Sequence, residues 1–254
     1  MGGLTVVHAL RARSPEVEIR YLGDTARLPY GTKSPHTVKK YALTCLNHLE
    51  SLGPLSGLVV ACNTASAHAV PAIRDYVGSR FPVWGVLEPG AESAAKSSKS
   101  GRIGVLATPG TITSGGYEQA IRRNRPDALV VSRPAALLVP LAEEGYTEGP
   151  VVDAVLSDYL SPLLDESIDT LVLGCTHYPL LKPAIQRWFR EREEHILIVD
   201  SAQAAADRVC ADYEVETAGQ RGELLIMVTD GGKRFREIAC RFLGETPLIR
   251  EVDI

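Results

Sequence analysis

The sequence LVVACNT at residues 58–64 has a counterpart in LVLGCTH at residues 171–177. Each segment has three aliphatic residues, one small residue, a cysteine and two polar residues, and the two lie almost half the chain length apart. Short, fully apolar runs are typical of strands buried in a parallel sheet that helices cover on both faces. The two segments therefore predict equivalent strands in two similar halves of the fold.

Apolar runs and helical patterns alternate along nearly the whole chain around these segments. Residues 37–52 show the i, i+3, i+4 apolar spacing of a helix with one buried stripe, and residues 102–108 form another apolar run before a helical pattern. Strands that alternate with helices indicate βαβ units and parallel sheets. We therefore expect an α/β fold of two pseudo-symmetric lobes, each a mainly parallel sheet flanked by helices. The expected first lobe comprises residues 1–87 and 201–254, and the second comprises residues 88–200.

The composition is that of an ordinary globular protein. Of 254 residues, 45% are hydrophobic and 23% are charged, and the formal net charge is −4 without a block rich in lysine or arginine. These values disfavour a nucleic-acid partner, and the chain has no apolar run of the roughly 20 residues that a membrane span needs. The five cysteines form no CxxC pair, which argues against a disulfide framework and a cysteine-rich zinc site. We expect free thiols, a cytoplasmic location and no membrane partner.

Cys62 and Cys175 end their predicted strands at the edge where parallel sheets bind ligands. The N-terminus of a following helix is expected to lower a thiol pKa from about 8.5 toward neutrality. A group with such a pKa works as a base in one direction and as an acid in the other. Two such thiols across a cleft could remove a proton from one face of a carbon and return one to the opposite face. The pattern thus predicts stereoinversion without a cofactor.

The other cysteines and the histidines are expected to have structural roles. Cys45, Cys210 and Cys240 fall on helical patterns, and free cysteine is among the most buried residue types. The histidines lack metal-ligand spacing, and the glycine-rich stretches lack dinucleotide and phosphate motifs, so neither a metal nor a cofactor is expected. A redox role for the thiol pair is disfavoured, because a disulfide needs Cα atoms about 4.4–6.8 Å apart whereas two bases need substrate between them.

The neighbouring segments point to a known family. They are GDTARLPYGTKS (23–34), VVACNTASA (59–67), GVLEPGA (85–91), IGVLATPGTITSGGY (103–117), VPLAEEG (139–145) and LVLGCTHYPLL (171–181). In order and spacing, over essentially the full chain, they resemble bacterial glutamate racemases of the aspartate/glutamate racemase superfamily. The resemblance implies a cofactor-independent isomerase that interconverts L- and D-glutamate for peptidoglycan synthesis, commonly as a homodimer, with its active site between two α/β lobes. An aspartate or other amino-acid racemase is the alternative, because one sequence does not reveal the length of the substrate side chain.

The resemblance also implies roles for individual residues. The two catalytic thiols would be Cys62, which deprotonates the D-substrate, and Cys175, which deprotonates the L-substrate, with Glu143 and His177 assisting. From the residues alone, a turn at Tyr30, helix caps after Cys62 and a solvated acid pair at Glu143 are open alternatives. Backbone N–H groups, hydroxyls and an amide could hold both substrate carboxylates without lysine or arginine. The substrate-binding positions by resemblance are Tyr30, Gly31, Asn63, Thr64, Thr176 and His177.

The start of the chain departs from the family. Its members open with a strand that ends in Asp-Ser-Gly-x-Gly-Gly-Leu-Thr, whereas this chain begins with Met-Gly-Gly-Leu-Thr. The resemblance therefore implies that a first strand is missing, with an aspartate that supports the first thiol and a serine that binds substrate. We favour a natural start further upstream, because a central parallel strand is costly to omit. The alternative is a weakly active or inactive homologue that serves as a binding protein.

Overall fold

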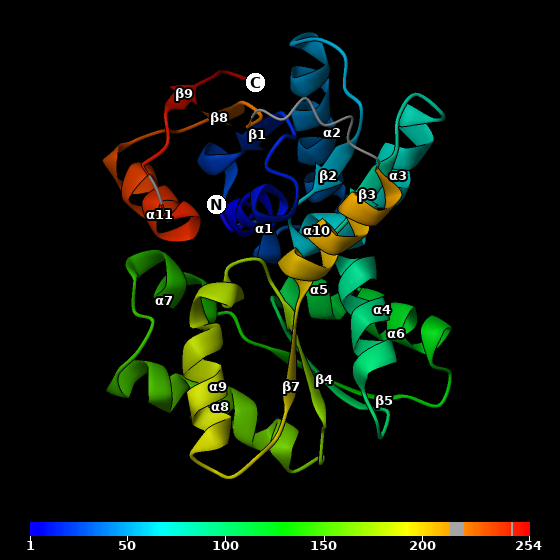
Figure 1. Ribbon diagram of the computed structural model, residues 1–254, viewed down its shortest axis with the longest axis vertical. Coiled ribbons are helices and arrows are strands. Elements are labelled where there is room, and N and C mark those ends of the chain that lie inside the picture. The colour runs from blue at the N-terminus through cyan, green and yellow to red at the C-terminus, as the bar shows by residue number, and fades with distance from the viewer. Residues whose placement is uncertain (214–220, 245) are drawn as a thin grey trace.

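The computed structural model describes residues 1–213, 221–244 and 246–254. Figure 1 shows two lobes along the longest axis of the molecule, the lower one built from the middle of the chain and the upper one from its two ends. Every paired strand in the described ranges runs parallel to its neighbour. The predicted α/β fold of two lobes with parallel sheets and flanking helices is confirmed.

The lower lobe is built on a four-stranded parallel sheet in the order β5-β4-β6-β7. Its central strands β4 and β6 are almost fully buried, which explains their continuous apolar runs. The strands are β4 (Arg102–Ala107), β5 (Leu129–Pro134), β6 (Thr170–Gly174) and β7 (Leu197–Asp200). The helices and helical turns are α4 (Leu87–Ser97), α5 (Pro109–Thr113), α6 (Gly116–Asn124), α7 (Leu138–Glu144), α8 (Pro150–Leu164), η3 (Tyr178–Leu181) and α9 (Lys182–Arg190).

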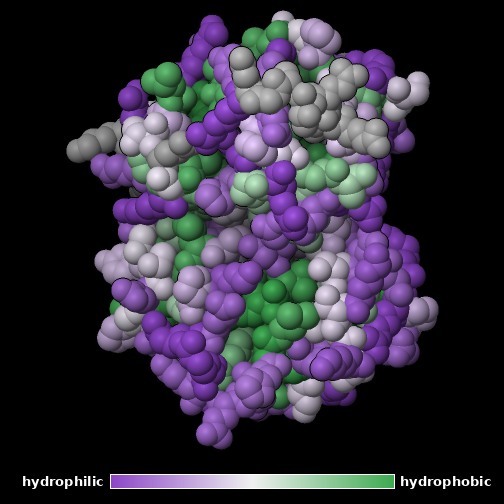
Figure 2. Space-filling view, viewed as in Figure 1, coloured by the Kyte–Doolittle hydropathy of each residue, from purple (hydrophilic) through white to green (hydrophobic). Residues whose placement is uncertain are grey.

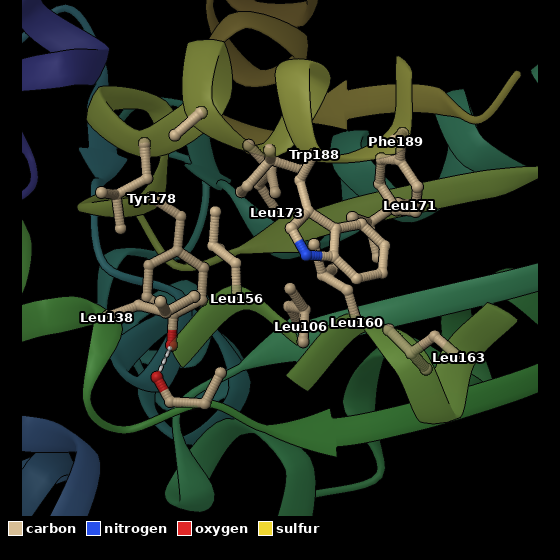
Figure 3. Packing of buried hydrophobic residues seen from close by; sticks show 14 of the residues in the cluster. Leu106, Leu138, Leu156, Leu160, Leu163, Leu171, Leu173, Tyr178, Trp188 and Phe189 are labelled. Atoms are coloured by element: carbon tan, nitrogen blue, oxygen red, sulfur yellow. Dashed lines mark hydrogen bonds between the residues drawn. The ribbon is translucent and has the colours of Figure 1, made fainter. Parts of the chain in front are cut away.

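Helices cover both faces of this sheet and supply most of the core. On one face, leucines of α8 pack with Trp188 and Phe189 of α9, and the buried Tyr178 donates a 2.7 Å hydrogen bond to the carbonyl of Ala135 (Figure 3). On the other face, α4 and α6 pack a second buried cluster against the sheet. The lobe is therefore a three-layered sandwich that fixes the end of β6.

The upper lobe holds its parallel strands in two sheets. One has the order β1-β8-β9, and the other pairs β2 with β3. The strands are β1 (Ile19–Gly23), β2 (Leu58–Val60), β3 (Val83–Gly85), β8 (Leu224–Val228) and β9 (Ile249–Glu251). The helices and helical turns are α1 (Leu4–Arg13), η1 (Thr25–Arg27), η2 (Tyr30–Thr32), α2 (Pro35–Ser51), α3 (Asn63–Val77), α10 (Ser201–Asp212) and α11 (Lys233–Leu243).

A mostly apolar cavity of about 350 Å³ separates these two sheets. It is lined by residues of β1 and β2, including Ile19, Tyr21 and Val59, and by Val6 and Leu10 of α1. Among the described strands, β1 pairs only with β8 and β2 only with β3, so β1 and β2 do not hydrogen-bond to each other. This cavity divides what the sequence predicted as a single sheet in this lobe into two parts.

Two helices did not follow from the sequence pattern. In α1, Val6 and Val7 are both buried, so the helix has no one-sided apolar stripe for the periodicity to reveal. The segment after Leu87 forms α4, whose small residues Ala91 and Ala94 pack fully buried in the core. Alanine is the best helix former, which accounts for a helix in a weakly apolar segment. The predicted lobe boundaries stay a prediction; α4 begins at Leu87 and β7 ends at Asp200.

The surface is largely polar. Figure 2 shows hydrophilic side chains over most of this face, with apolar residues gathered near the middle of the lower lobe, where Figure 1 places β7. None of the helices that the structure describes has the length and apolar character needed to cross a membrane.

One carboxylate secures the turn between α4 and β4. Asp169 accepts hydrogen bonds from the Ser98 hydroxyl at 2.6 Å and from the backbone N–H groups of Lys99 and Ser100 at 2.8 Å and 2.6 Å. Partial burial on its own raises the pKa of Asp169, but these hydrogen bonds together outweigh it, so the pKa lies well below its ordinary value. The charged form of Asp169 therefore stabilises the folded state.

Asp169→Asn is expected to lower the free energy of unfolding at pH 7 by about 1.5–3 kcal/mol, the range for hydrogen bonds to a charged group. Because the folded-state pKa is depressed, the stabilisation is present above the unfolded-state pKa of about 3.9 and fades as the pH falls through the folded-state value. Urea unfolding of both proteins across this pH range measures the difference. Asp158→Asn, at an exposed carboxylate on α8, is the control. Equal stability of Asp169→Asn and the unsubstituted protein at pH 7 would contradict the assignment.

Candidate active site

The two strand-end cysteines lie on the wall of one cavity of about 280 Å³. Cys62 follows β2 of the upper lobe and precedes α3, and Cys175 follows β6 of the lower lobe. Cys62 is half-buried and Cys175 is 6% exposed. The fold thus brings two thiols from equivalent strand ends of different lobes to the same space.

Most of the residues singled out from the sequence line this cavity. Glu143 is not among the lining residues; it lies behind them, with its carboxylate 3.0 Å from Nε2 of His177. Asp24, Thr108 and Val139 are among the residues of the cavity wall that were not singled out as site residues from the sequence. The predicted residues that line the cavity are Tyr30, Gly31, Cys62, Asn63, Thr64, Cys175, Thr176 and His177.

Cys175, His177 and Glu143 form a hydrogen-bonded row. The Sγ atom of Cys175 lies 3.6 Å from Nδ1 of His177, and the opposite ring nitrogen contacts the Glu143 carboxylate. With the proton of a neutral imidazole on Nε2, the ring donates to Glu143 and leaves Nδ1 to accept from the thiol. In this arrangement Cys175 is the acid or nucleophile, His177 is the base, and the Glu143 carboxylate orients the imidazole. It allows a proton to move between Cys175 and His177.

Burial has the largest effect on the pKa values of Cys175 and His177. Desolvation raises the pKa of Cys175 to about 12, against a lowering by the hydrogen bond from the His177 backbone, while nearby Cys62 and Glu143 add to the rise. The pKa lowering expected from the sequence is therefore wrong for Cys175, because burial of the thiol outweighs the hydrogen bond that favours its thiolate. Burial also lowers the pKa of His177, although Glu143 opposes this. At neutral pH the structure therefore holds a protonated thiol beside a neutral imidazole.

Helix α11 covers the outer side of this row. The Phe242 ring meets the His177 ring edge to face, with centroids 5.7 Å apart, and the Arg241 guanidinium donates a 2.6 Å hydrogen bond to the carbonyl of Glu143. Both contacts join the end of the chain in the upper lobe to the lower lobe. Neither contact could be predicted from the sequence, because the segment that forms α11 shows only the amphipathic pattern that many surface helices share.

Tyr30 is held at the cavity wall by an aspartate. Its hydroxyl donates to the Asp24 carboxylate, which also accepts from Nε of Arg27 at 2.7 Å and from the Thr229 hydroxyl at 3.2 Å. Asp24 thereby ties the loop that carries Tyr30 to the end of β8. The sequence interpretation of Tyr30 and Gly31 as a turn is compatible with η2, which begins at Tyr30 and lines the cavity.

Close packing explains the glycine at position 31. A Cβ atom on Gly31 would lie 2.8 Å from Cβ of Thr108, which is closer than real Cβ atoms approach. The loop of the upper lobe therefore touches the end of β4 in the lower lobe through a position that only glycine fits. This contact closes one side of the cavity.

Asn63 and Thr64 are not helix caps. The N-cap of α3 is Cys62, and its side chain makes no capping bond, whereas Asn63 and Thr64 are the first residues of the helix itself. The Thr64 hydroxyl instead lies 2.9 Å from the hydroxyl of Thr108 and 3.1 Å from that of Thr111. This cluster joins the start of α3 to the end of β4 across the two lobes. The position of Thr108 directly after an apolar run was the signal that could have identified it.

The cavity presents hydrogen-bond donors rather than cationic side chains. No lysine or arginine is among the lining residues that the structure describes. The first backbone N–H groups of α3 have no partner within the helix and can bind a carboxylate, because helix N-termini favour anions. The side chains of Thr64 and Thr176 line the same wall. The described residues contain no cluster of three side chains suited to hold a metal ion. The chemistry of the wall therefore suits a small, carboxylate-bearing molecule between two thiols.

Comparisons with known proteins agree with this geometry. The family model described as Asp/Glu/Hydantoin racemase matches residues 5–209. A glutamate racemase of Persephonella marina is 40% identical over 254 residues, covering 100% of this chain and 94% of that protein, and one of Geobacter metallireducens is 44% identical over 249 residues, covering 96% and 90%. The crystal structure of glutamate racemase from Francisella tularensis in complex with D-glutamate has a TM-score of 0.89 at 32% identity, covering 99% of this chain and 94% of that one.

Proposed function

This chain belongs to the Asp/Glu/hydantoin racemase family, and we propose that it interconverts L- and D-glutamate with Cys62 and Cys175 as the two acid–base groups. It is an amino-acid racemase, and its identity of 40% and 44% to glutamate racemases over nearly its full length makes glutamate the substrate. The observation that supports the role of the two thiols is their position on one cavity wall at the ends of β2 and β6.

The proposed reaction moves one proton at each face of the substrate Cα. One cysteine, as thiolate, first removes the Cα proton and becomes a thiol, leaving a carbanion; the other thiol then donates its proton to the opposite face of that carbanion and becomes a thiolate. The C–H bond that breaks and the one that forms are on opposite sides, so the configuration inverts and the enzyme is left ready for the reverse direction. No electron leaves the substrate, and the proposal includes neither a cofactor nor a metal.

The two thiols differ in their surroundings. The raised pKa of Cys175 supports its role as the acid, with Cys62 as the base that takes the proton from D-glutamate. When Cys175 must act as the base toward L-glutamate, His177 accepts its proton through Nδ1, and the Glu143 carboxylate stabilises the imidazolium that forms. In this proposal Tyr30, Gly31, Asn63, Thr64, Thr176 and His177 hold the substrate.

Several wider features complete the proposal. The two lobes are separate domains, residues 1–87 with 201–254 and residues 88–200. Reactive thiols stay reduced in the cytoplasm, which is where we place the protein. Its product is D-glutamate for peptidoglycan synthesis, and the protein forms a homodimer. Sedimentation analysis of the purified chain tests the last point.

Incubation of the purified protein with L-glutamate or D-glutamate in deuterated water tests the function. Optical rotation is expected to decay to zero from either enantiomer, because the equilibrium constant between enantiomers is one, and the product is expected to carry deuterium at Cα. L-aspartate run in parallel is the control and is expected to exchange far more slowly. Absence of Cα exchange with both glutamate enantiomers would contradict the proposal, and exchange with aspartate alone would identify the alternative racemase.

A further inference from the structure

A chain of buried polar side chains crosses between the lobes behind the two thiols. The Tyr117 hydroxyl of α6 lies 2.6 Å from Oδ1 of Asn63, Nδ2 of Asn63 lies 3.2 Å from Oγ of Ser201, and that oxygen lies 2.8 Å from the carbonyl of Leu173. Asn63 and Tyr117 are each 2% exposed, and Ser201 is fully buried. Figure 1 places α10, which begins at Ser201, at the junction of the two lobes.

The hydrogen-bond directions in this chain are determined by its last member. The Leu173 carbonyl accepts only, so the Ser201 hydroxyl donates to it and must accept from Asn63. The Asn63 amide therefore presents its NH₂ group to Ser201 and its oxygen to Tyr117, which donates. The hydrogen bond from Tyr117 thus favours this orientation of the Asn63 amide. Burial raises the pKa of the Tyr117 phenol well above its ordinary value, so the phenol keeps the proton that it donates.

Two members of this chain lie close to the thiols in the sequence. Asn63 follows Cys62 directly, and Leu173 lies two residues before Cys175 on β6. A second, longer link runs the same way, from the Thr176 hydroxyl to the carbonyl of Ala61 at 3.4 Å. The residue before Cys62 is therefore bonded to the residue after Cys175, and the residue after Cys62 is linked to β6 through Ser201.

The ring of Tyr117 also touches the second strand end directly. A Cβ atom placed on Gly174, the residue before Cys175, would lie 2.9 Å from the Tyr117 ring. One side chain therefore contacts the residue after the first thiol through its hydroxyl and the residue before the second thiol through its ring. Proton transfer at two faces of one carbon requires both thiols at near-attack distance, and a displacement of about 1 Å can cost about 10²-fold in rate.

We propose that Tyr117 and Ser201 are positioning residues that set the placement of Cys62 relative to Cys175 through Asn63. The inference rests on the proposed function of the two thiols. Neither residue lines the cavity, so both act through Asn63 and β6 rather than on the substrate. A purely structural network would contribute to stability alone, whereas a positioning network controls the proton-transfer step at saturating substrate.

Tyr117→Phe removes the donor and keeps the ring against Gly174. We expect kcat to fall about 10–100-fold in both directions with KM changed less than about threefold, because geometry at the reacting atoms is lost while the carboxylate contacts remain. The primary deuterium isotope effect with Cα-deuterated glutamate is expected to rise, because proton transfer becomes more fully rate-limiting. Ser201→Ala, which removes a smaller group, is expected to show the same pattern.

Tyr159→Phe on α8 is the matched control, since it removes a half-buried tyrosine hydroxyl that lies 3.4 Å from the Leu137 backbone nitrogen, and Tyr159 does not line the cavity of the two thiols. It is expected to leave kcat and the isotope effect unchanged. The unsubstituted protein tests the proposed function in the same assay, so an inactive parent is distinguishable from a failed inference. An active parent together with a folded Tyr117→Phe or Ser201→Ala variant of unaltered kcat and isotope effect would overturn the inference, even if its melting temperature had fallen.

Discussion

Replacement of Cys62 or Cys175 by serine is expected to lower racemisation about 10²–10⁴-fold, the contribution of a positioned acid–base group. Each turnover uses one thiol as the base and the other as the acid, so either substitution affects both directions. Because the equilibrium constant between enantiomers is one, kcat/KM must fall by the same factor from L-glutamate and from D-glutamate. Polarimetry from both enantiomers measures this.

Isotope exchange separates the roles of the two thiols. With Cys62→Ser, the remaining thiol still abstracts the proton from L-glutamate and returns one to the same face, so slow deuterium exchange without inversion is expected for L-glutamate only. With Cys175→Ser, the same exchange is expected for D-glutamate only. Cys210→Ser on α10, away from the cavity that holds both thiols, is the control and is expected to leave the rate unchanged. Full racemase activity in either strand-end variant would refute the two-thiol mechanism.

The fold could be predicted because its information is local. The segments at residues 58–64 and 171–177 show the buried strand, its polar end and its partner in the other half within a few residues each. The sequence pattern did not show α4, because its first turns contain Pro89 and Gly90, which are poor helix formers, beside Leu87 and small alanines. It also did not show the cavity between β1 and β2, because pairing between strands depends on distant segments.

The sequence predicted which residues form the site, but it did not predict how their surroundings shift their pKa values. Cys175 was correctly placed at a strand end, yet the direction of its pKa shift was wrong, because the burial that raises the pKa comes from residues of both lobes. Tyr117 lies in a segment that carried the family resemblance, but Asn63, the partner of both Tyr117 and Ser201, is far from them in the sequence. A single sequence identifies the reactive side chains more readily than the groups that position them.

Asymmetry between the two half-reactions is expected when Glu143 is replaced by glutamine. Glu143 raises the pKa of His177 against the lowering effect of burial, so in Glu143→Gln the imidazole accepts the Cys175 proton less readily. The transition state for proton transfer at Cys175 rises while that at Cys62 stays nearly the same. We expect kcat/KM to fall about 10²-fold, and equally in both directions as the equilibrium requires.

The substrate isotope effect then reports which thiol has become rate-limiting. With Cα-deuterated L-glutamate, Cys175 breaks the C–D bond in the slow step of Glu143→Gln, so the isotope effect should grow. With Cα-deuterated D-glutamate, Cys62 breaks that bond in the faster step, and the slow step is donation of a proton from Cys175, so the effect should vanish. The adjacent, exposed Glu144→Gln is the control and should leave both isotope effects unaltered. Equal isotope effects from both deuterated enantiomers in Glu143→Gln would show that Glu143 does not act through Cys175.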